Sequence, residues 1–169
     1  MKQLWAPWRM EYILNELGKT DGCIFCQFPQ KNNDEKYLIV YRSPLSFVIL
    51  NKFPYNNGHL MVVPYQHTGD ILDLSEDVLI DLQRTIRKSV QVLRNVMQPH
   101  AMNIGMNLGR SAGAGIDTHL HYHIVPRWDG DTNFMPVLAG TKIVSESLTT
   151  TWKKLQNEFK RLYGGEDKK

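Results

Sequence analysis

The sequence predicts a single domain in which an antiparallel β-sheet packs against helices. Short runs rich in β-branched and aromatic residues are separated by short connections, and two longer segments place apolar residues at helical spacing. Parallel neighbours would need a crossover of about a dozen residues or more, so these short connections favour antiparallel strands. At 169 residues the chain can bury a core without disulfides or a metal ion. We therefore expect one domain over residues 1–169.

The first half of the chain predicts one helix followed by three strands. Pro7 suits the first turn of a helix, so a helix over Pro7–Leu17 is expected within an amino-terminal helical extension of residues 1–20. Turn-forming residues then separate three short apolar runs. The strands predicted from these runs span Tyr37–Tyr41, Ser46–Leu50 and Gly58–Pro64.

The second half predicts two helices with a strand between them. Ser75 is a candidate cap for a helix that runs to about Met97, with an apolar stripe as its buried face. The alternation over Ala101–Leu108 predicts a strand whose polar side, which includes Asn107, faces a ligand. A last helix is expected over residues 145–165, where apolar residues recur at helical spacing until a pair of glycines.

The most unusual stretch is Thr118–Pro126, which places a histidine at every second position. On an extended strand, side chains alternate between two faces, so His119, His121 and His123 would project to one side. Neighbouring imidazoles on that face lie roughly 6.5–7 Å apart, close enough for one phosphate group or one metal ion to engage two of them. Just before this strand, the small residues of Gly109–Gly115 allow backbone amides to converge on an anion. The pattern therefore favours a phosphate site or a metal site.

Cys23 and Cys26 are the two cysteines, in the spacing Cys-x-x-Cys. That spacing suits half of a tetrahedral zinc site, a redox pair, or no special role. A structural disulfide is the least favoured reading in a reducing compartment. A zinc site would need two further ligands, for which the histidines are the candidates.

Composition and charge place few limits on partners. A net charge of +3 with 17 acidic residues does not by itself favour binding to nucleic acid or to a membrane. No apolar run approaches the roughly 20 residues that span a bilayer, and the first residues lack the features of a secretory signal. We therefore expect a cytoplasmic protein with neither nucleic acid nor membrane as a partner.

The segment His119–Val125 resembles the His-x-His-x-His-x-x pattern of the histidine triad (HIT) superfamily of nucleotide hydrolases and transferases. Asn51, followed by Gly58–Pro64, matches the supporting signature of that superfamily. Further likeness at Leu4–Arg9 and Pro126–Met135 is to the bacterial branch of diadenosine tetraphosphate phosphorylases and related hydrolases. The resemblance implies an α+β fold, in which a five-stranded antiparallel sheet with helices is extended across a homodimer.

The resemblance also implies a catalytic site. The central histidine, His121, would attack the α-phosphorus of a nucleotide, because a nucleotidyl-histidine intermediate divides one displacement into two easier ones. His123 and His59 would orient the nucleophile and contact the leaving group. The implied substrate contacts are Asn51 on the ribose, Gly113, Ala114 and Gly115 on phosphate oxygens, Asn107 in place of a family glutamine, and Trp128 stacked on adenine or packed at the dimer interface.

Two acceptors fit this chemistry. Inorganic phosphate would convert diadenosine tetraphosphate to ATP and ADP, whereas water would yield ATP and AMP, and phosphate is the acceptor we expect. Arg110 or Arg127 would pair with the charge of an incoming phosphate. A nucleoside phosphoramidate hydrolase and a non-catalytic nucleotide-binding module are the alternative functions.

Some members of the superfamily bind a structural zinc ion, and the matching residues here are Cys23, Cys26, His67 and His119. Two sulfurs and two nitrogens would close a tetrahedral site and leave no position for a catalytic water. His119 would then belong to the metal rather than to the phosphate. The alternative is that the cysteines are free thiols in a loop and His67 is a surface residue. The covalent route needs no divalent metal of its own, although magnesium bound with the substrate is compatible with it.

Overall fold

The computed structural model describes residues 22–131 and 146–165. The helix expected over Pro7–Leu17 lies outside the described residues, and so does the part of Pro126–Met135 that follows residue 131. None of the described helices is long and apolar enough to cross a membrane.

The centre of the fold is a five-stranded antiparallel sheet with strand order β1-β2-β3-β5-β4. This arrangement confirms the five-stranded antiparallel sheet expected from the resemblance. The strands span Ile39–Arg42 (β1), Ser46–Leu50 (β2), Leu60–Pro64 (β3), Ala101–Met106 (β4) and Tyr122–Arg127 (β5).

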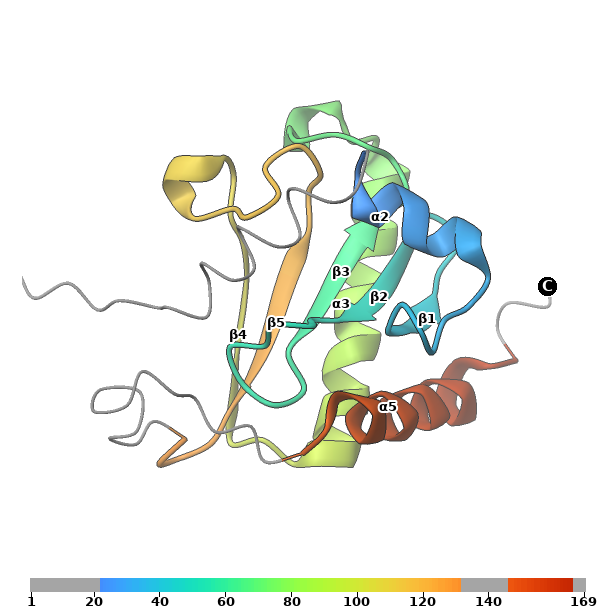
Figure 1. The fold of residues 1–169 in the computed structure, drawn as a ribbon, viewed down its shortest axis with the longest axis vertical. Coiled ribbons are helices and arrows are strands. Elements are labelled where there is room, and N and C mark those ends of the chain that lie inside the picture. Colours follow the sequence, from blue (N-terminus) through green and yellow to red (C-terminus); the bar gives the residue numbers. More distant parts are fainter. Residues whose placement is uncertain (1–21, 132–145, 166–169) are drawn as a thin grey trace, which may run out of the picture.

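Helices cover both faces of the sheet (Figure 1). Helices α3 and α5 pack on one face, and the short helix α2 packs on the other. Three short 3-10 helices complete the regular structure of the described residues. The bounds are Ile24–Gln27 (α2), Phe28–Lys31 (η1), Ile71–Asp73 (η2), Glu76–Met97 (α3), Arg110–Ala112 (η3) and Leu148–Tyr163 (α5).

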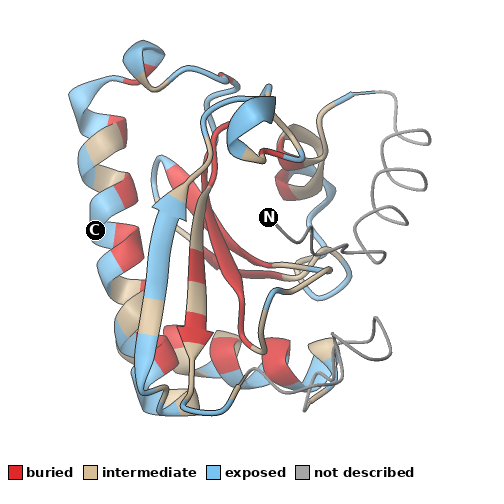
Figure 2. Ribbon diagram, turned by 90° about the vertical axis from the view of Figure 1, so that its left-hand side faces the viewer, coloured by how far each residue is buried: buried red, intermediate tan, exposed pale blue. Residues whose placement is uncertain are grey.

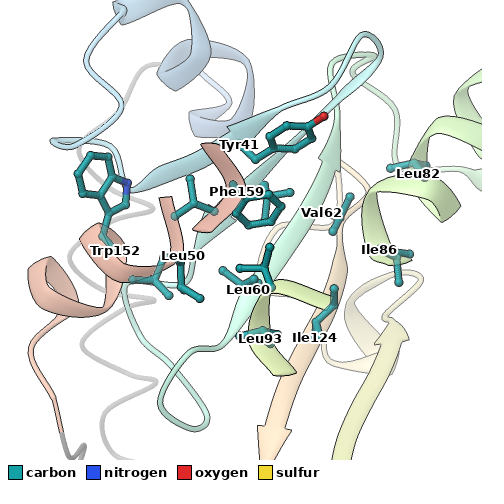
Figure 3. Packing of buried hydrophobic residues seen from close by; sticks show 14 of the residues in the cluster. Tyr41, Leu50, Leu60, Val62, Leu82, Ile86, Leu93, Ile124, Trp152 and Phe159 are labelled. Atoms are coloured by element: carbon teal, nitrogen blue, oxygen red, sulfur yellow. The ribbon is translucent and has the colours of Figure 1, made fainter. Parts of the chain in front are cut away.

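Alternation along β2 decides which side chains reach which layer. Val48 and Leu50 face α3 and α5, whereas Phe47 and Ile49 face α2. All four are buried, and Figure 2 shows the central strands as the most buried part of the sheet. Figure 3 shows Leu50 of β2 in the core layer to which α3 and α5 contribute their buried side chains. The central strands are therefore buried on both faces, which fixes the sheet between the two helical layers.

The two long helices begin at residues that satisfy their first backbone amides. The Ser75 hydroxyl accepts from the Val78 N–H at 3.4 Å, and the Ser147 hydroxyl accepts from the Thr150 N–H at 3.2 Å. The cap predicted at Ser75 and the helix end predicted at Met97 are confirmed. Helix α5 lies within the predicted range 145–165.

The histidine-rich strand begins later than the sequence predicts. Strand β5 starts at Tyr122, so the prediction of a strand over Thr118–His121 is wrong. The backbone there pairs with the loop that follows β3, because the Leu120 N–H donates to the Thr68 carbonyl at 2.8 Å. The first two histidines of the pattern therefore lie outside the ladder, whereas His123 lies within it.

Strand β4 is an edge strand, and the apolar side that its alternation predicts is only partly buried. Met102 and Met106 pack against the core on the side of α3 and α5. Ile104 is 47% exposed and Leu108, beyond the strand end, is 50% exposed. Strand β4 pairs with β5 on one side, and no other strand of the described residues pairs with its outer side. The alternation therefore identified the strand correctly, and two of the four side chains on its apolar side contribute to the core.

Candidate active site and metal centre

A cavity of about 660 Å³ lies on the face of the sheet that carries α2. Its wall contains five residues that the sequence predicts for catalysis or substrate binding. These are Asn51, Gly113, Gly115, His121 and His123. The structure therefore brings together the end of β2, the glycine-rich loop and the histidines.

Much of the remaining wall is apolar and was not predicted from the sequence. Phe25 and Phe28 lie beside the two cysteines, and Phe53 follows Asn51 closely in the chain. Met61 of β3 also contributes to the wall. Aromatic side chains of this kind pack well against a flat heterocycle such as a nucleobase. The signal that could have identified them is their proximity in sequence to the predicted site residues.

The ring of His121 is held in one tautomer. Its Nδ1 lies 2.9 Å from the His119 carbonyl oxygen, and a carbonyl can only accept a hydrogen bond. Nδ1 therefore carries the proton, and Nε2 keeps its lone pair. Burial lowers the pKa of His121 below its usual value, which keeps the ring neutral near pH 7. His121 thus has the protonation state that a nucleophilic nitrogen requires.

The ring of His123 is held in the opposite tautomer by a buried neighbour. The Tyr55 N–H donates to Nδ1 of His59 at 3.1 Å, so His59 carries its proton on Nε2. That nitrogen lies 2.9 Å from Nδ1 of His123 and donates to it. His123 therefore carries its own proton on Nε2, as a donor. Because the rings of His121 and His123 are 4.9 Å apart, the site combines a lone pair with an N–H donor.

Part of the glycine-rich loop uses its amides internally. The Gly113 N–H donates to the Arg110 carbonyl at 2.9 Å, and the Ala114 N–H donates to the Gly109 carbonyl at 3.3 Å. Gly113 and Gly115 line the cavity, whereas Ala114 does not. Of the three amides predicted to hold phosphate oxygens, the Gly115 amide is the one that these loop contacts do not engage.

The two arginines predicted to bind an incoming phosphate are paired with carboxylates instead. Arg110 lies 2.8 Å from Asp117, and Arg127 lies 2.7 Å from Asp131. Neither arginine lines the cavity. Two lysines, Lys36 and Lys52, line the cavity instead.

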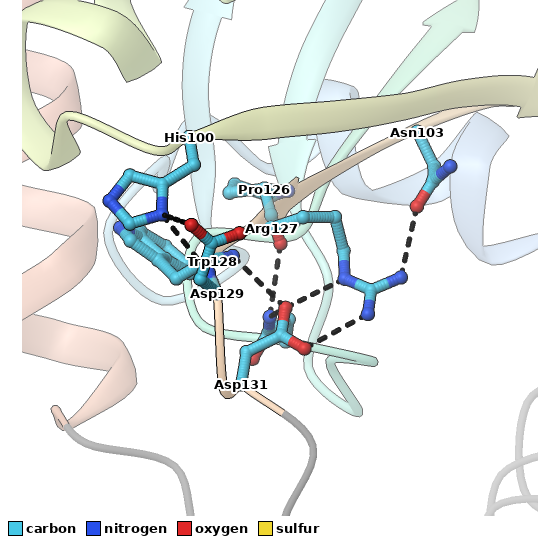
Figure 4. Close-up of polar contacts among 8 residues, drawn as sticks. His100, Asn103, Pro126, Arg127, Trp128, Asp129 and Asp131 are labelled. Atoms are coloured by element: carbon cyan, nitrogen blue, oxygen red, sulfur yellow. Dashed lines mark hydrogen bonds and ion pairs between the residues drawn. The ribbon is translucent and has the colours of Figure 1, made fainter.

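Trp128 and Asn107 lie apart from the cavity wall. Trp128 lines a separate hollow, and Figure 4 shows it in a polar network centred on Asp131. The Asp131 carboxylate accepts from the Trp128 N–H at 3.1 Å and from the Asn56 amide at 2.8 Å. Asn56 belongs to the loop that carries Tyr55, so this network supports the loop that orients His59. Within one chain, the structure does not bring Trp128 to the predicted adenine site.

Four side chains form a candidate metal centre next to the histidines. The ligand atoms of Cys23, Cys26, His67 and His119 all lie within 4.8 Å of one another. The sulfur–nitrogen separations are 3.2 Å for Cys23–His119, 3.3 Å for Cys26–His67 and 3.6 Å for Cys26–His119. His119 is fully buried, and its Nε2 donates to the Pro64 carbonyl at 2.9 Å, so its Nδ1 lone pair faces the other three ligands.

The protonation of His119 suits a metal ion, whereas that of Cys26 would change when a metal ion binds. Burial lowers the pKa of His119 to about 4, which leaves the neutral ring that a metal ion requires. Burial, followed by the neighbouring Cys23, raises the pKa of the Cys26 thiol to about 11. A bound cation would reverse this effect, because it stabilises the thiolate.

Phe25 connects the metal centre to the predicted nucleophile. It lies between the two cysteines in the sequence and is 2% exposed. Its ring centroid is 5.5 Å from that of His119 and 5.1 Å from that of His121. The His119 carbonyl also accepts the Nδ1 proton of His121. The position of His121 therefore depends on His119, a candidate metal ligand, and on Phe25, which lies between two others in the sequence.

Known proteins share both the sequence pattern and the fold. Residues 31–130 match the family described as HIT domain. A Mycobacterium tuberculosis protein named AP-4-A phosphorylase is 39% identical over 168 residues, which cover 95% of this chain and 86% of that protein. A Schizosaccharomyces pombe protein named bis(5'-nucleosyl)-tetraphosphatase (asymmetrical) is 37% identical over 93 residues, which cover 55% of this chain and 50% of that protein. The crystal structure of a hypothetical histidine triad nucleotide-binding protein from Sulfolobus tokodaii superposes with a TM-score of 0.67 and 26% identity, covering 85% of this chain and 97% of that chain.

Proposed function

Because the chain belongs to the HIT domain family, we propose that it cleaves diadenosine tetraphosphate or a related dinucleoside polyphosphate by nucleotidyl transfer to His121. The observation that carries this proposal is the pair of opposite tautomers at His121 and His123 in one cavity. A nucleotide-binding module would need the cavity but not this pairing. The name of the M. tuberculosis relative supports the same substrate class.

In the proposed first step, Nε2 of His121 attacks the α-phosphorus of one adenylyl group. The bond from that phosphorus to the bridging oxygen breaks, and ATP leaves with the electron pair. The N–H of His123 donates to that oxygen as its negative charge develops. Asn51 is our candidate contact for the ribose, and the Gly115 amide is our candidate contact for a nonbridging oxygen.

In the proposed second step, an oxygen of inorganic phosphate attacks the adenylyl-histidine. The phosphorus–nitrogen bond breaks, His121 recovers its lone pair, and ADP is released. Lys36 and Lys52 are the cations of the cavity wall that could pair with an incoming dianion. Water in place of phosphate would give AMP by the same route.

Product analysis tests this proposal directly. Diadenosine tetraphosphate is incubated with the enzyme, with and without inorganic phosphate, and the nucleotides are separated by ion-exchange chromatography. We expect ATP and ADP in equal amounts, with ADP formed only when phosphate is present. AMP with ATP regardless of phosphate would make water the acceptor, and the absence of any cleavage would refute the proposed activity.

We also propose that the four-residue centre binds a structural zinc ion. Zinc–sulfur bonds of about 2.3 Å and zinc–nitrogen bonds of about 2.0–2.1 Å give tetrahedral sulfur–nitrogen and nitrogen–nitrogen edges of roughly 3.6 and 3.3 Å. The corresponding separations here are 3.2 to 3.6 Å, and 3.2 Å between the Nδ1 atoms of His67 and His119. Four protein ligands leave no open position, so zinc would supply rigidity rather than an activated water.

We further propose a homodimer formed through the outer edge of β4. That edge presents backbone groups without a strand partner in the described residues, together with the exposed side chain of Ile104. We expect sedimentation to report about twice the chain mass of 19.6 kDa, and Ile104→Lys to shift the protein towards monomer. Ile80→Lys is the matched control, because Ile80 is similarly exposed, at 48%, but lies on α3. A wild-type protein that is monomeric at all concentrations would contradict the proposal.

A further inference from the structure

The second part of helix α3 is basic, although the whole helix is nearly balanced in charge. Helix α3 contains four cations and three carboxylates, and all three carboxylates precede residue 82. Residues 82–97 therefore carry +4, which exceeds the net charge of +3 of the whole chain. The modest net charge of the sequence conceals this basic segment.

The arginines of α3 differ from the other arginines of the described residues. Four arginines elsewhere each pair with a carboxylate, in the pairs Arg42–Asp34, Arg110–Asp117, Arg127–Asp131 and Arg161–Glu158. Arg84, Arg87 and Arg94 are exposed and have no ion pair or side-chain hydrogen bond among the described residues. The α3 arginines therefore remain open to an external anion.

These three arginines form a line on one side of α3. Positions 84, 87, 91 and 94 share one helical face, and 10 residues of helix span about 15 Å. Gln91 occupies the position between Arg87 and Arg94. Figure 2 shows α3 along one side of the molecule with exposed stretches recurring on its outer side. The result is a row of guanidinium groups rather than a broad patch.

The helix dipole does not explain this row. The dipole favours carboxylates in the first turn of a helix and cations in the last turn, and its effect fades within those turns. Glu76 and Asp77 in the first turn and Arg94 in the last turn fit this rule. Arg84 and Arg87 lie in the middle of the helix, where the dipole offers no gain. Two of the three charges are therefore not accounted for by the helix dipole.

We propose that the outer face of α3 binds the sugar-phosphate backbone of a nucleic acid. A guanidinium group matches a phosphate with two parallel hydrogen bonds, and a linear row of them fits a linear polyanion better than a flat membrane. Helix α3 contains no aromatic residue that could stack on a base. The proposed contacts are therefore with the phosphates, and binding is independent of the base sequence of the nucleic acid. This surface reverses the expectation from net charge that nucleic acid is not a partner.

The proposed surface is separate from the cavity. Helix α3 packs on one face of the sheet, and the cavity lies on the opposite face with α2. A nucleotide in the cavity and a nucleic acid on α3 can therefore be bound at the same time. Saturating AMP in the assay would block the cavity without affecting binding to α3.

The test is a salt titration of binding to a fluorescein-labelled 20-base-pair DNA duplex, in which fluorescence anisotropy reports binding in the presence of AMP. Each phosphate contact contributes about −0.9 to the slope of log affinity against log salt. Three arginines therefore predict a slope close to −3 for the wild type. The variant R84Q/R87Q/R94Q is expected to bind at least ~10-fold more weakly at low salt, with a slope shallower by about 3.

The control variant K31Q/K153Q/K154Q removes the same charge from exposed lysines outside the row. We expect it to keep the wild-type affinity and slope, and thermal unfolding of both variants will show that the fold is retained. Equal weakening by both variants would overturn the proposal in favour of general electrostatic attraction. A wild-type protein that does not bind the duplex at low salt would also overturn the proposal. The same holds if these arginines bind phosphatidylserine vesicles and the protein does not bind the duplex.

Discussion

His121→Ala is expected to lower the turnover of diadenosine tetraphosphate by at least about 10⁴-fold, because it removes the nitrogen that forms the covalent intermediate. Alanine cannot attack phosphorus, and His123 is held in the tautomer that offers a proton rather than a lone pair. Nucleotide binding should change by only a few fold, because the apolar wall of the cavity and Asn51 are unaltered. Turnover is measured by product chromatography, and AMP affinity by titration calorimetry.

His100→Ala is the matched control for this experiment. His100 is exposed, pairs with Asp129 and lies outside the cavity wall, so its loss should leave turnover and AMP affinity unchanged. Residual turnover in His121→Ala within about tenfold of the wild type would exclude His121 as the nucleophile. Loss of AMP binding together with turnover would point to a binding role and favour the non-catalytic module.

Cys23→Ser is expected to lower the zinc content well below the one ion per chain that we predict for the wild type. The substitution replaces a soft sulfur ligand with a hydroxyl that zinc holds poorly. We expect a loss of at least about 3 kcal/mol of stability, or roughly 6–12 °C in the unfolding temperature. Metal analysis and thermal unfolding of protein purified without added metal provide the two measurements.

A glycine substitution tests the same centre without touching a ligand. A Cβ at Gly69 would lie 2.5 Å from the Asp117 carbonyl oxygen, so Gly69→Ala forces apart the loop of His67 and the segment of His119. We expect a lower zinc content in this variant. Gly165→Ala is the control, because a Cβ there meets nothing within 4 Å. A wild type that is free of zinc and fully stable in chelator would contradict the metal proposal.

Loss of zinc should also slow the reaction, through the contacts that surround Phe25. Phe25 packs on His121, and the His119 carbonyl fixes the tautomer of the same ring. When the cysteines and His119 lose their common ion, both contacts loosen. A zinc ion at this centre would therefore hold the proposed nucleophile in place as well as the loop that precedes it.

Local signals in the sequence predicted much of the fold. Strand β2 and helix α3 match their predicted bounds, because alternation, a serine cap and a helical stripe are properties of short segments. The predicted start of the histidine strand at Thr118 was wrong. The backbone hydrogen bond from Leu120 to Thr68 that shapes this stretch joins segments that are far apart in the chain. Such contacts leave no local pattern.

The candidate site was predictable to a similar degree. The resemblance to the HIT superfamily, which rests on the spacing of the histidines, implied the residues that the structure brings together in the cavity and at the candidate metal centre. The pairing of Arg127 with Asp131 and the position of Trp128 depend on the turn after β5 and could not be predicted. The row of arginines on α3 was visible in the spacing, but the net charge concealed it.

The stereochemical course at the α-phosphorus tests the central claim most directly. The substrate is diadenosine tetraphosphate with a phosphorothioate of known configuration at the attacked phosphorus, and inorganic phosphate is the acceptor. Two successive in-line displacements, first by His121 and then by phosphate, predict retention of configuration in the ADP product. Inversion would mean that phosphate attacks the substrate directly, and would contradict a covalent nucleotidyl-histidine intermediate.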